Sequence, residues 1–191
     1  MEVKTIWYLC MLVANIWWFY YVYAPLVADG DWATVVKKLG QVTYGNHLNQ
    51  TIYFLKGYIR SIRGTPHSYS DLVQLYVFMG ISPTLATGFW YFYLTDLSFW
   101  GLPYYDWWSE DWMCNHIQHT LIVLPIFIEP LVNSDLNLKR ITMKSILGYN
   151  LVGILNICLH HRLFYLYHRY TVYPWELKAA KWFVVLFYGG V

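Results

Sequence analysis

Charged residues are scarce in this chain. Asp, Glu, Lys and Arg make up only 13% of its 191 residues, whereas a soluble domain carries about a quarter. The formal net charge of +2 is too small, and its charges too scattered, to indicate binding to nucleic acid. No internal repeat or low-complexity tract is present either. The sequence therefore excludes a charge-rich soluble domain, a nucleic-acid-binding protein and a repeat array.

Cysteine is also rare. Cys10, Cys114 and Cys158 lie in or beside apolar runs and show no paired spacing. We interpret them as small core residues that do not set the redox compartment. A small-residue cleavage site is missing after the first apolar run, Ile6–Ala28, which is long enough to span a bilayer. We therefore expect this run to be a retained helix and not a cleaved signal.

Apolar and aromatic residues are abundant. They include 11 Trp and 19 Tyr, and hydrophobic residues make up 58% of the chain. Trp and Tyr are enriched where membrane helices cross the two membrane interfaces. We predict an all-α protein, a multispanning transmembrane helix bundle that forms a single domain over residues 1–191.

Five segments are predicted to cross the membrane as helices. In chain order they are Ile6–Ala28, Val42–Arg60, Asp71–Thr95, Asn115–Val132 and Ile141 to His161 or slightly beyond. Pro125 and Pro130 should bend the fourth helix. Ser61–Ser70 is rich in Gly, Pro and small polar residues and is typical of a loop. The aromatic, acidic segment from Asp96 to Met113 is expected to lie at the interface.

The last apolar run, Trp182–Val191, is too short to cross a bilayer alone. We expect five complete spans plus a partial sixth, so that the domain lacks part of its last helix. Alternate connections share a membrane face, with seven Lys and Arg residues on the N-terminal side and six on the other. This difference slightly favours a cytosolic N-terminus.

This topology gathers polar residues at one face. The starts of the second and fourth helices and the end of the fifth lie on the same side of the membrane, together with five of the seven histidines. These are His47, His116, His119, His160 and His161. Polar side chains are costly within a membrane and mark functional sites. The sequence therefore predicts a water-accessible polar pocket at this end of the bundle.

Thr43 and the histidines supply the groups that nucleophilic catalysis needs. A threonine hydroxyl becomes a nucleophile when a base takes its proton, and a neutral histidine suits that role near neutral pH. Candidate donors to an oxyanion or to the substrate are Asn46, His47, Asn115 and His116. Glu129 lies about three turns beyond His119, too deep to complete a serine-type triad. We therefore expect a Thr-His dyad.

At these positions the chain resembles a known family. The likeness extends from about Gly40 to Pro130 and is strongest in three stretches. They are Thr43-Tyr44 with Gln50; Phe89-Trp90-Tyr91 with Tyr93 and Asp96; and Asn115 to Thr120 with Leu124-Pro125 and Ile128-Glu129. The sequence is similar to the androgen-induced and androgen-dependent TFPI-regulating proteins, membrane threonine hydrolases that cleave fatty acid esters of hydroxy fatty acids.

The resemblance implies a six-span fold and a carboxylic ester hydrolase that takes its lipid ester substrate from the bilayer. Thr43 would be the nucleophile and His119 the general base. The resemblance implies no cofactor and no metal, and it assigns no role to His160 and His161. We expect an integral, multi-pass protein of the endoplasmic reticulum or the plasma membrane.

Two other classes stay open from the residues alone. A metal-dependent lipid enzyme could use His116, His119, His160 and His161, although membrane di-iron enzymes need more histidines at other spacings. A non-enzymatic channel or transporter would need polar side chains through both halves of the membrane, whereas the fourth helix becomes largely apolar after its start.

Overall fold

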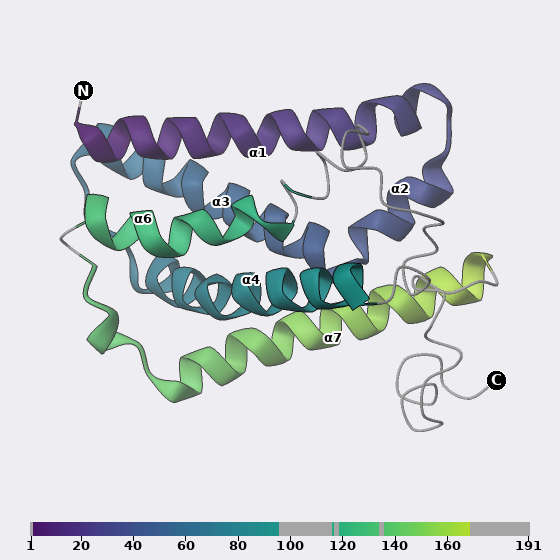
Figure 1. The fold of residues 1–191 in the computed structure, drawn as a ribbon. Coiled ribbons are helices and arrows are strands. Elements are labelled where there is room, and N and C mark those ends of the chain that lie inside the picture. The colour runs from purple at the N-terminus through teal and green to yellow at the C-terminus, as the bar shows by residue number, and fades with distance from the viewer. Residues whose placement is uncertain (1, 96–115, 117–118, 134–135, 169–191) are drawn as a thin grey trace.

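The structure, a computed structural model, describes residues 2–95, 116, 119–133 and 136–168. Within these residues every regular element is a helix and there is no strand. The long helices are α1 (Val3–Ala28), α3 (Val42–Arg63), α4 (Tyr69–Thr95) and α7 (Met143–His168). They lie alongside one another in a bundle (Figure 1). The all-α prediction is confirmed. The predicted segments Asp96–Met113 and Trp182–Val191 lie outside the described residues.

Shorter helices connect the long ones. They are α2 (Trp32–Leu39), α6 (Leu124–Val132) and the 3-10 turns Leu121–Val123 and Leu138–Arg140. The sequence predicts no helix at α2, which begins where the Asp31 side chain accepts a hydrogen bond from the backbone N–H of Thr34 at 3.1 Å. The single helix expected over Asn115–Val132 is wrong in one respect, since a 3-10 turn separates its beginning from α6.

The connection between α3 and α4 is shorter than the predicted loop, Ser61–Ser70. α3 continues to Arg63 and ends at Gly64, which adopts the left-handed conformation at φ 62° that glycine tolerates best. Ser68 and Asp71 then cap α4 reciprocally. The Asp71 carboxylate accepts from the Ser68 N–H at 2.9 Å, and the Ser68 hydroxyl accepts from the Asp71 N–H at 3.3 Å. The connection is thereby reduced to residues 64–68.

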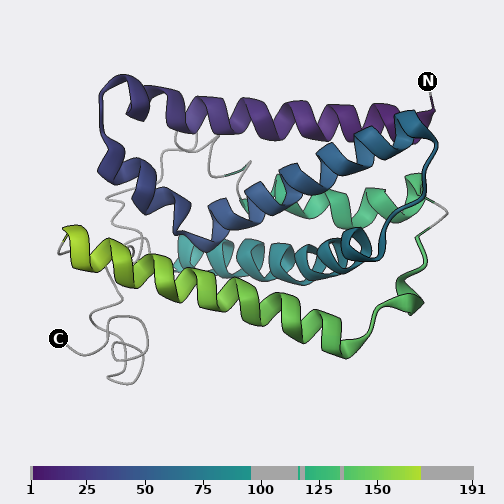
Figure 2. The ribbon, with the colours of Figure 1, turned by 180° about the vertical axis from the view of Figure 1, so that it is seen from behind.

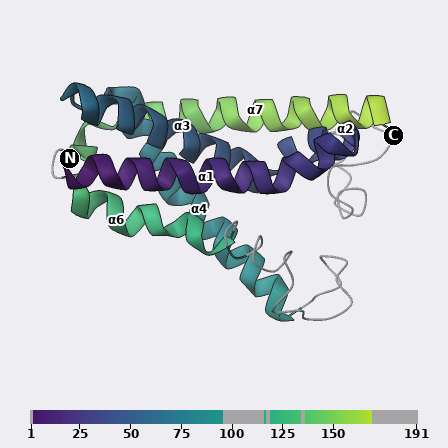
Figure 3. The ribbon, with the colours of Figure 1, turned by 90° about the horizontal axis from the view of Figure 1, so that it is seen from above.

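The chain crosses the length of the bundle repeatedly, so each end of the bundle has its own set of connections. The N-terminus, residues 64–68 and the start of α7 lie at one end (Figures 1 and 2). The α1–α2 turn, α2, the start of α3 and the end of α7 lie at the other. Viewed from above, α4 runs obliquely, and its C-terminal end diverges from α7 (Figure 3). This arrangement places the starts of α3 and α4 at opposite ends.

Two described helices are long and apolar enough to cross a membrane, Val3–Ala28 and the portion of α4 from Tyr69 to Tyr91. The other described helices do not meet both conditions. α7 extends beyond its predicted end near His161, to His168, and many of its apolar side chains are exposed. The exposed side chains of α1, α6 and α7 are mainly apolar, whereas buried polar side chains gather between the helices.

Candidate active site

One face of the first half of α3 is polar and points into the bundle. It carries Thr43, His47 and Gln50, which share a stripe because helical positions four and seven residues apart lie on one face. His47 is 3% exposed and Gln50 is 1% exposed, while Thr43 is half-buried in the first turn of α3. The predicted stripe therefore faces the interior.

Amides of α3 hold the neighbouring segments in place. Gln50 Nε2 donates to Ser82 Oγ of α4 at 3.0 Å and to the backbone carbonyl of Ile122 at 3.1 Å. Asn46 Nδ2 also donates to Ser82 Oγ at 3.0 Å. Ser82 is fully buried, so these bonds are shielded from water. They join α3 to α4 and to the 3-10 turn that precedes α6.

His47 is held by α1. Its Nδ1 lies 3.1 Å from Asn15 Oδ1, and its ring stacks on Trp18 with centroids 4.1 Å apart and planes inclined by 19°. The Asn15 amide donates from Nδ2 to the carbonyl of Met11 at 2.8 Å, which identifies Oδ1 as the oxygen facing His47. His47 Nδ1 is therefore the protonated nitrogen that donates to Asn15, and it cannot also donate to a substrate oxyanion.

His119 lies deep in the bundle, beside the same stripe. It is 6% exposed and stacks on Phe89 of α4, with ring centroids 3.9 Å apart and planes inclined by 11°. The segment of His119 runs in the same direction as α3, because Gln50 pairs with Ile122 and Tyr53 with Glu129. His47 lies three residues before Gln50, and His119 lies three residues before Ile122. The two histidines are therefore at the same level along the bundle.

Thr43, like Thr5 of α1, lies in the first turn of its helix, where no carbonyl of that helix lies four residues earlier. Thr51, Thr84 and Thr95 each donate to the backbone carbonyl four residues earlier, at 2.6 to 2.9 Å, the ordinary role of a threonine in a helix. The Thr43 hydroxyl makes no hydrogen bond among the described residues, including to His119. Thr43 is one turn before His47, about 6 Å along the helix axis. Its hydroxyl is therefore available for chemistry.

His116 is held by a different pair. Trp90 Nε1 donates to Thr120 Oγ1 at 2.9 Å, and Thr120 Oγ1 lies 3.1 Å from His116 Nδ1. A hydroxyl has one hydrogen to donate and two lone pairs, so this contact fits either tautomer of His116. In both tautomers His116 keeps one ring N–H and stays a candidate oxyanion donor.

The remaining predicted residues have separate outcomes. Asn46 is buried, and only one of its two amide N–H groups is needed for its bond to Ser82. Asn115 lies outside the described residues.

His160 Nε2 is 2.9 Å from the carbonyl of Val36, and His161 Nε2 is 2.8 Å from that of Gly40. These two histidines attach the end of α7 to the α2–α3 turn, next to the start of the polar stripe.

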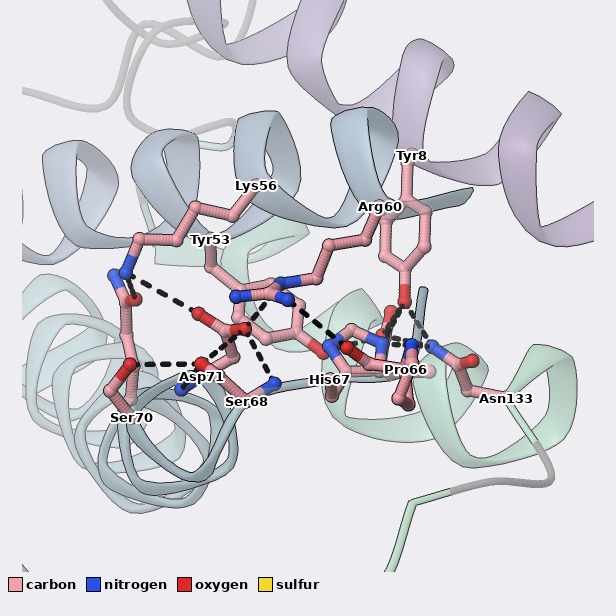
Figure 4. Close-up of polar contacts among 12 residues, drawn as sticks. Tyr8, Tyr53, Lys56, Arg60, Pro66, His67, Ser68, Ser70, Asp71 and Asn133 are labelled. Atoms are coloured by element: carbon pink, nitrogen blue, oxygen red, sulfur yellow. Dashed lines mark hydrogen bonds and ion pairs between the residues drawn. The ribbon is translucent and has the colours of Figure 1, made fainter. Parts of the chain in front are cut away.

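A second polar cluster surrounds Glu129 at the other end of the bundle. The Glu129 carboxylate is fully buried and accepts from Trp7 Nε1 at 2.7 Å, Tyr8 OH at 2.8 Å, Tyr53 OH at 2.6 Å and Asn133 Nδ2 at 2.8 Å. In Figure 4, Tyr8 reaches from α1 toward Asn133 and the connecting residue His67. Glu129 therefore joins α1, α3 and α6, and its carboxylate is committed to these four donors.

His67 closes this cluster from the connection between α3 and α4. Its Nε2 lies 2.8 Å from Tyr8 OH and 3.1 Å from Asn133 Nδ2. Burial lowers the pKa of His67, and the nearby carboxylates of Glu129 and Asp71 oppose that effect. The imidazole is therefore neutral at neutral pH.

An ion-pair group lies beside the second cluster. Asp71 is 1% exposed at its side chain, and its carboxylate pairs with Arg60 at 2.7 Å and with Lys56 at 3.4 Å (Figure 4). Lys56 also donates to Gln74 Oε1 at 3.0 Å. These contacts fasten the end of α3 to the start of α4. They have a structural role.

An apolar layer separates the two polar clusters. Leu12 lies between Tyr8 and Asn15 on α1, and Phe54 follows Gln50 on α3. Leu75 and Phe78 lie between Asp71 and Ser82 on α4. These four apolar residues are buried and belong to one core cluster. On α1, α3 and α4, packed hydrocarbon therefore lies between the two clusters, and the buried Gln74 of α4, which bonds to Asn49 and Lys56 of α3, lies in the same stretch.

Asn15, Trp18 and Ser82 were not expected in the site from the sequence. Asn15 alone carries a usable signal, because it is the one amide in the otherwise apolar Ile6–Ala28 run.

Across the part of the chain that the structure describes, no group of three or more His, Cys, Asp or Glu side chains is arranged to hold a metal ion. Comparisons with models of protein families, with curated proteins and with solved structures found no match.

Proposed function

We propose that this protein is a multi-pass membrane enzyme that hydrolyses lipid esters with a threonine nucleophile. One observation carries the proposal. The Thr43 hydroxyl makes no hydrogen bond among the described residues and lies on the same inward-facing stripe as buried His47, at whose level buried His119 also lies. A hydroxyl one helical turn from the level of a buried imidazole supplies the two groups that nucleophilic catalysis needs.

A membrane location fits the distribution of side chains. The chain buries Asn15, His47, Gln50 and Glu129 while it exposes leucines, valines and isoleucines along α1 and α7. In water this distribution would be unfavourable. In a bilayer, apolar side chains face lipid and polar ones pair inside the bundle. The five complete spans and partial sixth of the sequence prediction are part of this proposal.

The substrate enters from the bilayer with its acyl chain between helices and its ester carbonyl near Thr43. His119 takes the hydroxyl proton as Thr43 Oγ1 attacks the carbonyl carbon, and the proton passes to the departing alkoxide. His119 then removes a proton from water, which attacks the acyl-threonine and releases the fatty acid. Oxyanion donors are the second N–H of Asn46 and the ring N–H of His116. The reaction needs no cofactor.

The resemblance to the androgen-induced and androgen-dependent TFPI-regulating proteins narrows the substrate. It implies fatty acid esters of hydroxy fatty acids. The apolar layer between the two polar clusters favours an enzyme whose pocket is closed at depth over a channel. A channel or transporter would need a polar path through the whole bundle.

The proposal is tested with Thr43→Ala and His119→Ala in detergent-purified protein. Each variant is expected to lose ester hydrolysis while its thermal unfolding midpoint stays near that of the wild type. Thr84→Ala is the matched control, because this exposed threonine makes an ordinary bond to the Gly80 carbonyl. It should keep full activity.

A fluorophosphonate probe supplies a second measurement. Intact-protein mass spectrometry should find one probe on the wild type, and fragment mapping should place it on Thr43. Thr43→Ala should remain unlabelled. Labelling of Thr43→Ala at the wild-type rate would show that another residue is the nucleophile.

A further inference from the structure

Hydrogen-bond donors gather around Tyr44 without acceptors to match them. Tyr44 is buried against α1, where its ring contacts the rings of Trp18 and Tyr23 with centroids 5.1 and 5.9 Å away. Trp18 Nε1 and the Tyr23 hydroxyl are both shielded from solvent, and neither makes a hydrogen bond among the described residues. Buried polar atoms in native proteins almost always have a partner, so two such atoms beside one ring call for an explanation.

Lys38 adds a positive charge to this group. Its Nζ donates to the Tyr44 hydroxyl oxygen at 2.8 Å and lies 5.1 Å from the centroid of the Tyr44 ring. The Lys38 side chain is half-buried and forms no ion pair with any carboxylate among the described residues. An ammonium group carries three hydrogens and has no lone pair to accept with. The bond to Tyr44 therefore leaves two of its N–H groups for another partner.

The ordinary role of a lysine at this position does not account for Lys38. A lysine in the last turn of a helix interacts with the negative end of the helix dipole and extends its ammonium into water. Both Lys37 and Lys38 lie in the last turn of α2. Lys38, however, reaches to the buried Tyr44. A partly desolvated ammonium is stabilised by an opposite charge, and the described part of the chain supplies none there.

This cluster lies at the end of the bundle that also carries the proposed nucleophile. α2, the start of α3 and the end of α7 lie together there (Figure 1). Lys38 is five residues before Thr43, across the turn between α2 and α3, and Tyr44 follows Thr43 directly. The turn is held in place, because the Gly40 carbonyl lies 2.8 Å from His161 Nε2 of α7. The charge of Lys38 is thereby kept near the start of the polar stripe.

We propose that Lys38 binds the carboxylate of an amphiphilic lipid, with Trp18 and Tyr23 beside the same subsite. A carboxylate fits this place, because an ionised carboxylate only accepts hydrogen bonds and carries the charge opposite to that of Lys38. The identity of the lipid rests on the function proposed above, since a fatty acid ester of a hydroxy fatty acid has one free carboxyl group. Binding of that group at Lys38 positions the ester carbonyl for attack by Thr43.

Substrates with and without the charge test this subsite. Lys38→Gln is assayed on a fatty acid ester of a hydroxy fatty acid and on the methyl ester of the same molecule. We expect kcat/KM for the free acid to fall by about 10-fold, the loss of one charge-assisted hydrogen bond, and kcat/KM for the methyl ester to stay at the wild-type value. Lys37→Gln is the matched control, because it removes the same charge from the same turn of α2. It should leave both substrates unchanged. An equal loss on both substrates in Lys38→Gln, or no loss on the acid, overturns the subsite.

A binding measurement is independent of activity. Thr43→Ala protein in lipid nanodiscs is titrated with radiolabelled oleate, and oleyl alcohol and oleyl phosphate serve as competitors. Oleate should bind, oleyl alcohol should compete poorly, and Lys38→Gln in the same background should weaken oleate binding by about 10-fold.

The outcomes separate this subsite from the hydrolase. Oleate binding that does not depend on Lys38, or stronger competition by oleyl phosphate than by unlabelled oleate, overturns the carboxylate site while Thr43 labelling still supports the hydrolase. Lys38-dependent oleate binding by a protein whose wild type neither hydrolyses esters nor labels at Thr43 overturns the hydrolase and supports the carboxylate site.

Discussion

At the scale of single residues, the buried polar groups fall into two kinds. The Glu129 carboxylate accepts from four donors, which leaves it no capacity for a ligand and makes it a structural link between α1, α3 and α6. His119 Nδ1 is buried without a hydrogen-bond partner among the described residues, and the half-buried Thr43 hydroxyl makes no hydrogen bond there either. Satisfied networks rigidify a core, whereas unsatisfied buried groups mark places where function opposes stability.

Glu129→Gln should destabilise the protein. The glutamine side chain has one accepting oxygen and one NH2 group in place of the two carboxylate oxygens. Its NH2 would therefore face either Trp7 Nε1 or the three donors that bond to Oε1 of Glu129. Leaving a buried donor without its acceptor costs about 1–3 kcal/mol. The thermal unfolding midpoint in detergent measures the effect.

Glu2→Gln is the control for that experiment. Glu2 is exposed, and its ion pair with Lys4 at 3.1 Å should contribute little. Equal shifts of the midpoint in Glu129→Gln and Glu2→Gln would contradict a structural role for the Glu129 cluster.

Residue types at helical spacing were enough to predict part of the site. The stripe of Thr43, His47 and Gln50 follows from the period of the helix, and its inward face is confirmed. The catalytic roles of Thr43 and His119 stay predictions. The role of His47 changes, because its Nδ1–H is bound to Asn15. No spacing rule within one helix could reveal a partner on another.

At the scale of elements, α1 and α3 approach each other closely at Gly57. A Cβ atom added there would lie 2.6 Å from the buried Tyr8 ring, which is itself held by Glu129. A larger residue would therefore push Tyr8 away from the carboxylate. Glycine at this position lets the two helices pack while the Tyr8 hydroxyl keeps its hydrogen bonds.

Gly57→Ala is expected to lower stability by about 1–3 kcal/mol, the range for overpacking in a well-packed core. Gly45→Ala, on the same helix, has nothing within 4 Å of its added Cβ. It should be neutral or stabilising, since alanine favours a helix more than glycine does. Thermal unfolding of both variants compares them directly. A Gly57→Ala variant as stable as Gly45→Ala would contradict the close approach.

The break before α6 has a local cause. Pro125 lies at the start of α6, lacks an N–H and would clash with the carbonyl four residues earlier in a continuous α-helix. The chain forms the 3-10 turn Leu121–Val123 there instead. A bend is predictable from the proline. Within this turn, the carbonyl of Ile122 accepts a hydrogen bond from Gln50.

At the scale of the whole molecule, apolar side chains cover the outside. Leu131 is 82% exposed and Tyr167 is 84% exposed, while Glu129 and Gln50 are buried. Large exposed apolar surfaces mark contact with a membrane or another protein. Two described helices are long and apolar enough to cross a membrane, which supports contact with a membrane.

Cysteine labelling tests whether α3 crosses the membrane. Asp29→Cys and Thr65→Cys are placed beyond the two ends of α3, in a background where the three native cysteines are replaced by serine. In sealed microsomes, a membrane-impermeant maleimide should label only one of the two positions. With the N-terminus cytosolic, that position is Thr65→Cys. Permeabilisation should allow both to react. Labelling of both positions in sealed vesicles would contradict a transmembrane α3.

The sequence by itself determined the helical class, the long helices to within a few residues at most ends, and the polar face of α3. These follow from composition and from helical period, which are local properties of the chain. The tertiary structure alone decided that Asn15 binds His47, that Ser82 joins two amides, and that Glu129 collects donors from three segments. Apart from Asn133, which is four residues from Glu129, these partners are separated by 32 to 122 residues along the chain. They meet only because helix packing sets the level at which each side chain lies, and no local pattern encodes that level.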